Sequence, residues 1–286
     1  MDISVVVCTK NRPTDLCRCL HAIFDIEFDG EWEIIVVDNG SADETADLLY
    51  TLSPLSPVPF RVLFETQPGN SAGRNAAIPL AAGELLFFTD DDCLVEPEVL
   101  QEMWQIFRDE RMGFAGGRIR LFNPQDYPVG IMEVAEHIDI PPGTLVYPGL
   151  VQGSNMAFRR KLLVDLGGFD PEFGAGASFA GEELELATRA SMQGWHGGYF
   201  PGPTVAHNHG RKRASALRSE MQYDIGIGAY YSKFLLDATT RKRCALVWAR
   251  RSVKQLFRHP RGLPRQVAGA VRYLRLHNGE QEAPHS

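Results

Sequence analysis

The stretch Glu84-Leu85-Leu86-Phe87-Phe88-Thr89-Asp90-Asp91-Asp92 is an apolar run that ends in three consecutive carboxylates. A short, nearly continuous apolar run is typical of a strand that is covered on both faces of a sheet. Three similar runs lie upstream, at residues 3–8, 33–38 and 60–64, and each is followed by a polar turn and a helix-like stretch. Repeated strand–helix units of this kind predict an α/β fold with a doubly wound, mainly parallel sheet.

The helix-like stretches carry their own signals. Pro13 and the apolar spacing after it predict a helix behind the first strand. The residues Ser41-Ala42-Asp43-Glu44 fit a capping box, which would begin the second helix. A third helix is expected over residues 72–82, and a fourth is expected to begin near residues 96–98.

The composition is that of a folded protein. Of the 286 residues, 44% are hydrophobic and 23% are charged, which excludes a disordered chain. No run of 18 apolar residues is present, so no segment is expected to span a bilayer. The N-terminus lacks the stages of a secretion signal, and we therefore expect a cytoplasmic protein. Five scattered cysteines argue against a disulfide framework.

The charge is unevenly distributed along the chain. Residues 1–210 hold 13 basic and 31 acidic residues, whereas residues 211–275 hold 16 basic and only three acidic residues. We therefore expect a body at 1–210 and a basic, amphipathic helical extension at 211–286.

Two interpretations of this extension stay open. A basic amphipathic helix with Trp and Phe is typical of a membrane surface, which predicts peripheral contact at the inner face of the membrane through residues 211–275. In the other interpretation, the helices pack on the body and leave a solvated basic face. A nucleic-acid partner is not expected, because the body is acidic and no nucleic-acid motif is present.

Polar residues follow each of the four predicted strands. The carboxyl ends of parallel strands meet at one edge of a sheet, so we expect these side chains to lie together. The sequence contains neither the glycine-rich motif of dinucleotide-binding folds nor a P-loop. A phosphate group would therefore have to be bound by other residues. The strand-end residues are Thr9, Asn11, Arg12, Asp38, Asn70, Arg74, Asp90, Asp91 and Asp92.

The three aspartates indicate a cation site. Adjacent carboxylates raise one another's pKa unless a positive charge neutralises them. Mg²⁺ or Mn²⁺ prefers carboxylate oxygens, with water and nucleotide phosphates completing the shell. The alternative is that the aspartates cap the helix expected near residues 96–98. The polar ends of the other three strands favour the metal.

Several short sequence motifs resemble, in kind and in order along the chain, those of the family 2 glycosyltransferases. These enzymes have a nucleotide-sugar-binding A-type fold. They include Val5-Val6-Val7-Cys8-Thr9-Lys10-Asn11-Arg12, Val36-Val37-Asp38-Asn39-Gly40-Ser41, Gly73-Arg74-Asn75 and Phe88-Thr89-Asp90-Asp91-Asp92, with further matches at 153–159, 167–170 and 181–186. The resemblance covers roughly residues 1–210 and implies a nucleotide-binding half at 1–112 and an acceptor-binding half at 113–210.

The same resemblance implies an activity. It is the inverting, metal-dependent transfer of a sugar from a nucleotide diphosphate sugar, most naturally a UDP-sugar, to a hydroxyl of a saccharide or lipid-linked acceptor. Carried over by position, Thr9 and Arg12 would lie against the base, and Asp38 would accept a hydrogen bond from it. Arg74 would reach the base or the diphosphate, and Asp90 would hold the ribose or the sugar.

The resemblance also implies a metal site. Asp92 ends the D-x-D pattern and would bind the cation that bridges the two phosphates. In similar enzymes a histidine at the position of His207 completes the metal shell, although a histidine is often only structural. Asn11, Asn70 and Asp91 complete the residues that we expect at the donor site, from their positions at strand ends.

The family's acidic pair Glu-Asp appears here as Glu182-Glu183, so Glu183 is the candidate general base. The alternative is that these residues form a solvated helix face, with an i,i+4 pair between Glu185 and Arg189. The change from Asp to Glu also leaves open a non-catalytic nucleotide-sugar-binding or scaffold protein of the same fold. The glycine-rich segment 173–181 could be a mobile loop over the substrates or a plain linker.

Overall fold

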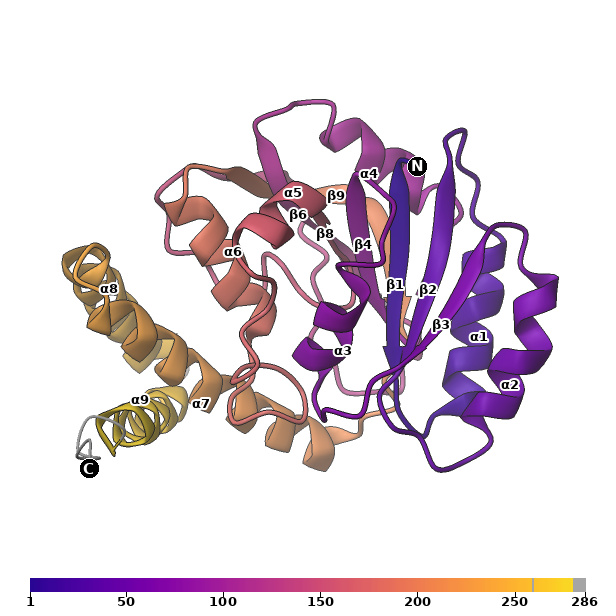
Figure 1. Cartoon of the computed structure of the whole chain (residues 1–286). Coiled ribbons are helices and arrows are strands. Elements are labelled where there is room, and N and C mark those ends of the chain that lie inside the picture. Colours follow the sequence, from indigo (N-terminus) through magenta and orange to yellow (C-terminus); the bar gives the residue numbers. More distant parts are fainter. Residues whose placement is uncertain (259, 280–286) are drawn as a thin grey trace, which may run out of the picture.

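The structure is a computed structural model that describes residues 1–258 and 260–279. It consists of a curled sheet between two layers of helices, with three further helices at the C-terminal side (Figure 1). The strands are β1 (Ile3–Thr9), β2 (Trp32–Asp38), β3 (Phe60–Phe64), β4 (Leu85–Asp90), β5 (Cys93–Val95), β6 (Met112–Leu121), β7 (Ile138–Ile140), β8 (Met156–Arg159) and β9 (His196–His207). The helices of the two layers are α1 (Pro13–Phe24), α2 (Thr45–Leu52), α3 (Asn70–Ala77), α4 (Val99–Ile106), α5 (Arg160–Asp165) and α6 (Glu182–Met192), with a 3₁₀ turn at Ser53–Leu55.

The first half of the sheet is parallel, with strand order β3-β2-β1-β4. Successive residues of its strands point to opposite faces, and both faces are apolar. Val5 and Val7 join the core under α1, α2 and α4, whereas Val6 joins the core under α3, α5 and α6. Burial on both faces explains why these strands are nearly continuous apolar runs in the sequence.

The second half of the sheet adds antiparallel strands. The strand β8 lies between β4 and β6 and is antiparallel to both, whereas β6 and β9 are parallel to each other. The short strands β5 and β7 both pair with β9 in antiparallel fashion. The predicted α/β class, with parallel strands and helices on both faces, is confirmed, and the whole sheet is mixed.

Two predicted helix boundaries are wrong. The capping box at Ser41 does not form, because the Ser41 hydroxyl instead accepts a hydrogen bond from the Asn11 backbone N–H at 2.9 Å. The second helix begins only at Thr45, whose backbone N–H and hydroxyl both donate to the Asp43 carboxylate. The third helix spans Asn70–Ala77 rather than 72–82, since a turn follows Ala77.

Three helices follow the sheet: α7 (Arg213–Leu236), α8 (Arg241–Arg258) and α9 (Gly262–Gly279). The two predicted amphipathic stretches lie in α7 and α8, and α9 was not predicted. Tyr230 of α7 is fully buried, and its hydroxyl lies 2.9 Å from the Thr188 hydroxyl of α6. Lys233 donates to Asp170 and to Glu185, each at 2.5 Å. The extension therefore packs on the body through α7; residue 259 and residues 280–286 lie outside the described part.

Glycines bring α7 and α9 unusually close together. A Cβ atom at Gly228 of α7 would overlap the carbonyl oxygen of Gln266, and one at Gly269 of α9 would overlap the carbonyl oxygen of Ile225. Only glycine allows the two backbones to approach this closely. Among the described residues, no helix is both long enough and apolar enough to cross a membrane.

Candidate active site

A cavity of about 650 Å³ opens where β1, β4 and β9 end. Residues from all parts of the chain line it, from Cys8 in β1 to Arg272 in α9. The residues predicted from the sequence that line this cavity are Thr9, Arg12, Asn70, Arg74, Asp90, Asp91, Asp92, Glu183 and His207. The remaining two, Asn11 and Asp38, are not among its lining residues.

Asn11 and Asp38 are engaged in the turn that follows β2. The Asn11 side-chain oxygen accepts from the Ala42 N–H at 2.8 Å, and Asn11 itself has a left-handed backbone with φ of 53°. The Asp38 carboxylate is buried and accepts from the Ser41 N–H at 2.8 Å. Asn39, the residue after Asp38, was not predicted as a site residue but lines the cavity.

The middle aspartate fixes the end of β1. The Asp91 carboxylate accepts from the Thr9 hydroxyl at 2.8 Å and from Arg12 Nη1 at 2.9 Å. Burial raises the pKa of Asp91 to about 7, although the Arg12 charge and the Thr9 hydrogen bond oppose this rise. The alternative that the aspartates cap a helix is wrong, because strand β5 follows Asp92 directly and α4 begins only at Val99.

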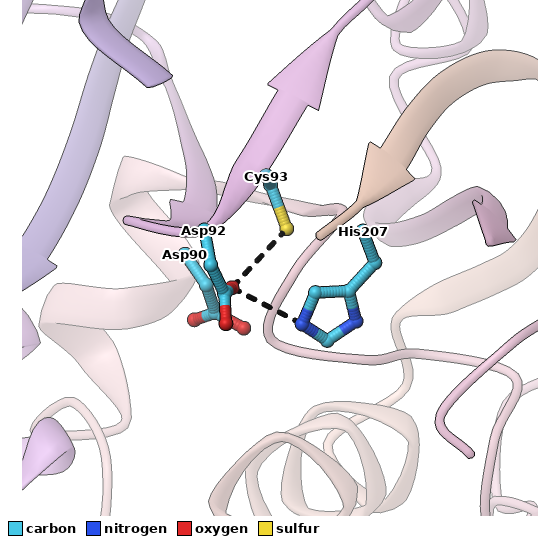
Figure 2. Close-up of side chains that lie close together, drawn as sticks. All are labelled: Asp90, Asp92, Cys93 and His207. Carbon is cyan, nitrogen blue, oxygen red and sulfur yellow. Dashed lines mark hydrogen bonds and ion pairs between the residues drawn. The ribbon is translucent and has the colours of Figure 1, made fainter. Parts of the chain in front are cut away.

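The other two aspartates join a group of metal-ligating side chains (Figure 2). Ligand atoms of Asp90, Asp92, Cys93 and His207 all lie within 4.8 Å of one another. His207 Nε2 lies 3.1 Å from Asp92 Oδ1. Although burial alone would raise the pKa of Asp92, the hydrogen bond from His207 and the charges of His207 and Arg12 hold it below its usual value.

The donor set fits a divalent cation. Two carboxylates suit Mn²⁺ or Mg²⁺, which prefer oxygen ligands, and the imidazole favours the transition metal Mn²⁺ over Mg²⁺. His207 Nδ1 is buried, and among the described residues it has no hydrogen-bond partner. Burial raises the pKa of the Cys93 thiol well above its usual value, so this sulfur is a neutral, weak ligand.

Arg74 connects two sides of the cavity. Its side chain is almost fully buried, and it crosses from α3 toward both β4 and α6. Nη1 lies 2.7 Å from Oε1 of Glu182, and Nη2 lies 3.2 Å from Oδ1 of Asp90. Asn70 Nδ2 also donates to Glu182 Oε1, at 3.4 Å. Burial would lower the pKa of Arg74, but the charges of Glu182 and Asp90 raise it, so the guanidinium stays charged.

The candidate base lies in the first turn of α6. Glu183 is half-buried and lines the cavity. Burial raises the pKa of Glu183 well above its usual value, the negative charge of Glu182 raises it further, and Arg74 opposes the rise. The alternative of a solvated helix face is wrong, since Glu182 and Glu185 are buried. The expected pair is nevertheless present, with Arg189 Nε 2.7 Å from Glu185 Oε1.

The glycine-rich segment 173–181 also lines the cavity and is held at its start. The Asn70 N–H donates to the Ala175 carbonyl at 2.9 Å, and the Ser71 hydroxyl donates to the Phe173 carbonyl at 2.5 Å. Beyond it, the C-terminal helices complete the wall with Gln222 and Tyr223 from α7 and Arg272 from α9. No sequence pattern pointed to these residues, because only the tertiary packing brings them to the cavity.

A comparison with known protein families finds a match over the first part of the chain. Residues 4–167, more than half of the chain, match the family described as glycosyl transferase family 2. The chain therefore belongs to this family of glycosyltransferases. The membership expected from the sequence strings is thereby confirmed.

Individual proteins extend the comparison beyond the family match. The beta-monoglucosyldiacylglycerol synthase of Trichormus variabilis is 24% identical over 202 residues, which cover 68% of this chain and 42% of that protein. The chain spans about a third of the length of the first curated relatives that it matches.

Two solved structures show the same fold. The mannosyltransferase PcManGT from Pyrobaculum calidifontis, in complex with GDP-Man and Mn²⁺, has a TM-score of 0.66 at 19% identity and covers 99% of this chain and 76% of its own. Residues 1–349 of TarS from S. aureus, in complex with UDP-GlcNAc, have a TM-score of 0.62 at 18% identity and cover 85% of this chain and 69% of that one. The A-type glycosyltransferase fold is thus confirmed.

Proposed function

We propose that this glycosyltransferase moves a sugar from a nucleoside diphosphate sugar to an acceptor hydroxyl, with inversion at the anomeric carbon and with the help of a divalent cation. The observation that carries the proposal is the cavity that Glu183 and the Asp90–Asp92–His207 group share. The substrates named for PcManGT and TarS, a GDP-sugar with Mn²⁺ and a UDP-sugar, support this donor class. We propose that the nucleotide of the sugar donor is UDP.

The nucleotide sugar would bind at the wall of the cavity where β1, β4 and β9 end. Asp90, Asp92 and His207 would hold Mg²⁺ or Mn²⁺, which when bound neutralises charge on the diphosphate. Thr9 and Arg12 would face the base. Asn11 and Asp38 would act on the base indirectly, since their side chains hold the turn that follows β2.

On the donor side, Asn70 and Arg74 would lie beside the diphosphate. Arg74 is already bonded to Glu182 and Asp90 and is therefore fixed before substrate arrives. A preorganised cation favours the transition state, because negative charge grows on the departing nucleoside diphosphate.

Glu183 would take the proton of the acceptor hydroxyl. The hydroxyl oxygen bonds to the anomeric carbon as the bond from that carbon to the phosphate oxygen breaks, and the nucleoside diphosphate leaves with the electron pair. A single displacement of this kind inverts the anomeric configuration. A carboxylate with a raised pKa is the stronger base, which suits this role.

The test is a panel of nucleotides on the wild type and on Asp92→Ala. Thermal unfolding is followed with UDP, dTDP, GDP, CDP and ADP, each with and without Mn²⁺. We expect UDP to stabilise the wild type only with metal, by about 2.7 kcal/mol at 100 times its Kd, and to lose this effect in Asp92→Ala. If no nucleotide stabilises the wild type under any condition, the proposed donor site is wrong.

We also propose a division of labour within the chain. Residues 1–112 would bind the nucleotide, residues 113–210 would contribute to acceptor binding, and residues 211–275 would attach the protein to a membrane surface. The helix α8 supports the last point, because exposed apolar residues share one of its faces with basic ones. The apolar members are Leu246, Val253, Leu256 and Phe257, and the basic neighbours are Lys242, Arg250 and Lys254.

This face would make peripheral contact with an anionic membrane. Sedimentation with anionic liposomes at low salt tests the contact, with Phe257→Asp on α8 and the control Phe64→Asp on β3, where Phe64 is also exposed. We expect only Phe257→Asp to reduce sedimentation. A wild-type protein that stays in the supernatant would contradict membrane contact.

A further inference from the structure

The C-terminal helix carries a second hollow that meets the catalytic cavity at one residue. Arg272 of α9 lines both of them. The residues of the second hollow follow the spacing i, i+3, i+4, i+7 and i+8, so they form one stripe along the helix. They are Ala268, Val271, Arg272, Arg275 and Leu276.

The stripe combines apolar surface with positive charge. Val271 and Leu276 are 41% and 46% exposed, so the stripe offers apolar surface to solvent. Arg272 and Arg275 make no ion pair with any carboxylate in the described part of the chain. The Arg272 guanidinium lies 5.1 Å from the ring centre of Phe179, in the glycine-rich segment that lines the catalytic cavity.

Arg272 belongs to the wall of the cavity that also holds the candidate base. Glu183 of α6, Tyr223 of α7 and Arg272 of α9 line it together. The acceptor hydroxyl has to reach Glu183 to lose its proton, so an acceptor that enters past α9 passes Arg272 on its way. The stripe therefore touches the wall of the cavity at Arg272 and continues along α9.

We infer that the acceptor is a lipid-linked molecule, in which a phosphate group joins the hydroxyl-bearing part to a hydrocarbon chain. The inference rests on the proposed function and adds the chemical class of its acceptor. The hydrocarbon chain lies on Val271 and Leu276, and the phosphate lies between Arg272 and Arg275. Two guanidinium groups that have no carboxylate partner in the described part of the chain complement a phosphate, whereas a neutral lipid or a free sugar offers them no charge.

The helix α8 adds to this assignment. It packs beside α9, where Trp248 Nε1 lies 3.4 Å from the side-chain oxygen of Gln266. The exposed apolar and basic face of α8 therefore belongs to the same C-terminal unit as the stripe. The hydrocarbon chain of an acceptor in the membrane could therefore contact the stripe while part of it stays in the lipid.

The experiment measures binding of three probes to the full chain, below the critical micelle concentration of each. They are farnesyl phosphate, farnesol, which lacks the charge, and glycerol phosphate, which lacks the hydrocarbon chain. We expect farnesyl phosphate to bind at least about tenfold more tightly than either of the others. Equal binding of farnesol, or equal binding of glycerol phosphate, overturns the inference.

Variants locate the site. Arg275→Glu is expected to weaken the binding of farnesyl phosphate about tenfold, and Val271→Asp is expected to weaken it as well. Arg18→Glu on α1 makes the same change of charge at an exposed position far from the stripe in the sequence, and it is expected to leave the affinity unchanged. Equal losses in Arg275→Glu and Arg18→Glu would mean general charge attraction and overturn the site.

UDP binding in the presence of Mn²⁺ is measured on every variant. It reports whether the protein is folded and whether the donor site is intact. If UDP binds and farnesyl phosphate does not, the acceptor inference fails while the proposed donor chemistry stands. If UDP does not bind to the wild type, the proposed function itself fails.

Discussion

Nη1 of Arg74 lies 2.7 Å from Oε1 of Glu182, and this contact joins α3 to the residue that precedes the candidate base. The other end of the same guanidinium reaches Asp90 of the aspartate cluster. One buried cation thus connects the donor side of the cavity with its base side. Because two carboxylates hold Arg74 in place, the loss of either one would change the position of the guanidinium on both sides of the cavity.

Arg74→Lys tests this connection. A lysine keeps the charge but has a single ammonium group in place of the planar guanidinium, so it cannot contact Glu182 and Asp90 at the same time. We expect sugar transfer at saturating donor to fall about 100-fold, the size of loss seen when a preorganised charge donor is removed. The matched control is Arg111→Lys, an exposed arginine whose Nη2 lies 2.7 Å from Asp109; its turnover should not change. Equal activity in the two variants would contradict the role of Arg74.

Glu183→Gln removes the proton acceptor but keeps the size of the side chain. We expect transfer to fall by about 100-fold or more, in line with the contribution of general bases, while UDP still stabilises the protein. The measurement is the rate of UDP release with donor, acceptor and Mn²⁺. Glu110→Gln, at an exposed position, is the control. Unchanged turnover in Glu183→Gln would remove this residue from the mechanism.

The pH profile of transfer follows from the raised pKa of Glu183. The base works only when it is ionised, so activity is lost as the pH falls through this pKa. Burial and the charge of Glu182 raise the pKa, and the acid limb therefore lies at higher pH than an ordinary glutamate would give. In Glu182→Gln the neighbouring negative charge is gone, so the acid limb should move to lower pH. A limb that stays in place would show that another group titrates.

His207→Gln tests the metal site. The imidazole is bonded to Asp92 and belongs to the ligand group, so its loss should weaken the apparent affinity for Mn²⁺ about tenfold or more. The readout is the Mn²⁺ concentration that gives half of the stabilisation by UDP. His209→Gln is the control, because His209 is equally buried but lies outside the ligand group. Similar effects of both changes would argue against a ligand role for His207.

Gly228→Ala tests the close packing of α7 on α9. In most helices, replacing glycine by alanine stabilises the fold by about 0.4–1 kcal/mol. Here the new methyl group would overlap the Gln266 carbonyl oxygen, so we expect the free energy of unfolding to fall by about 1–3 kcal/mol. Arg218→Ala, at an exposed position of the same helix, should change it little. Stabilisation by Gly228→Ala would contradict the close approach of the two helices.

The sequence allowed the aspartate cluster to be predicted because the ends of parallel strands meet at one edge. It could not predict where a side chain at such an end is directed. Asp38 lies at the predicted edge, yet its carboxylate bonds the Ser41 N–H, and it does not line the cavity. Cys93 was missed because a buried cysteine next to a strand has the pattern of a core residue.

The base side shows the same limit. The family pattern allowed Glu183 to be predicted as the base, but the same residues also fitted a solvent-exposed helix face. Only tertiary packing buries Glu182 and Glu185, through Arg74 on one side and Lys233 of α7 on the other. Long-range contacts of this kind leave no trace in local periodicity, and for the same reason Tyr223 and Arg272 could not be foreseen.

The wall formed by α7 and α9 has a consequence for biosynthesis. A growing chain that has reached the end of β9 already contains the aspartates, His207 and Glu183, but Tyr223 and Arg272 are still untranslated. The pocket of such an intermediate is open to solvent on the base side. The cavity is therefore complete only after Arg272 has been added to the growing chain.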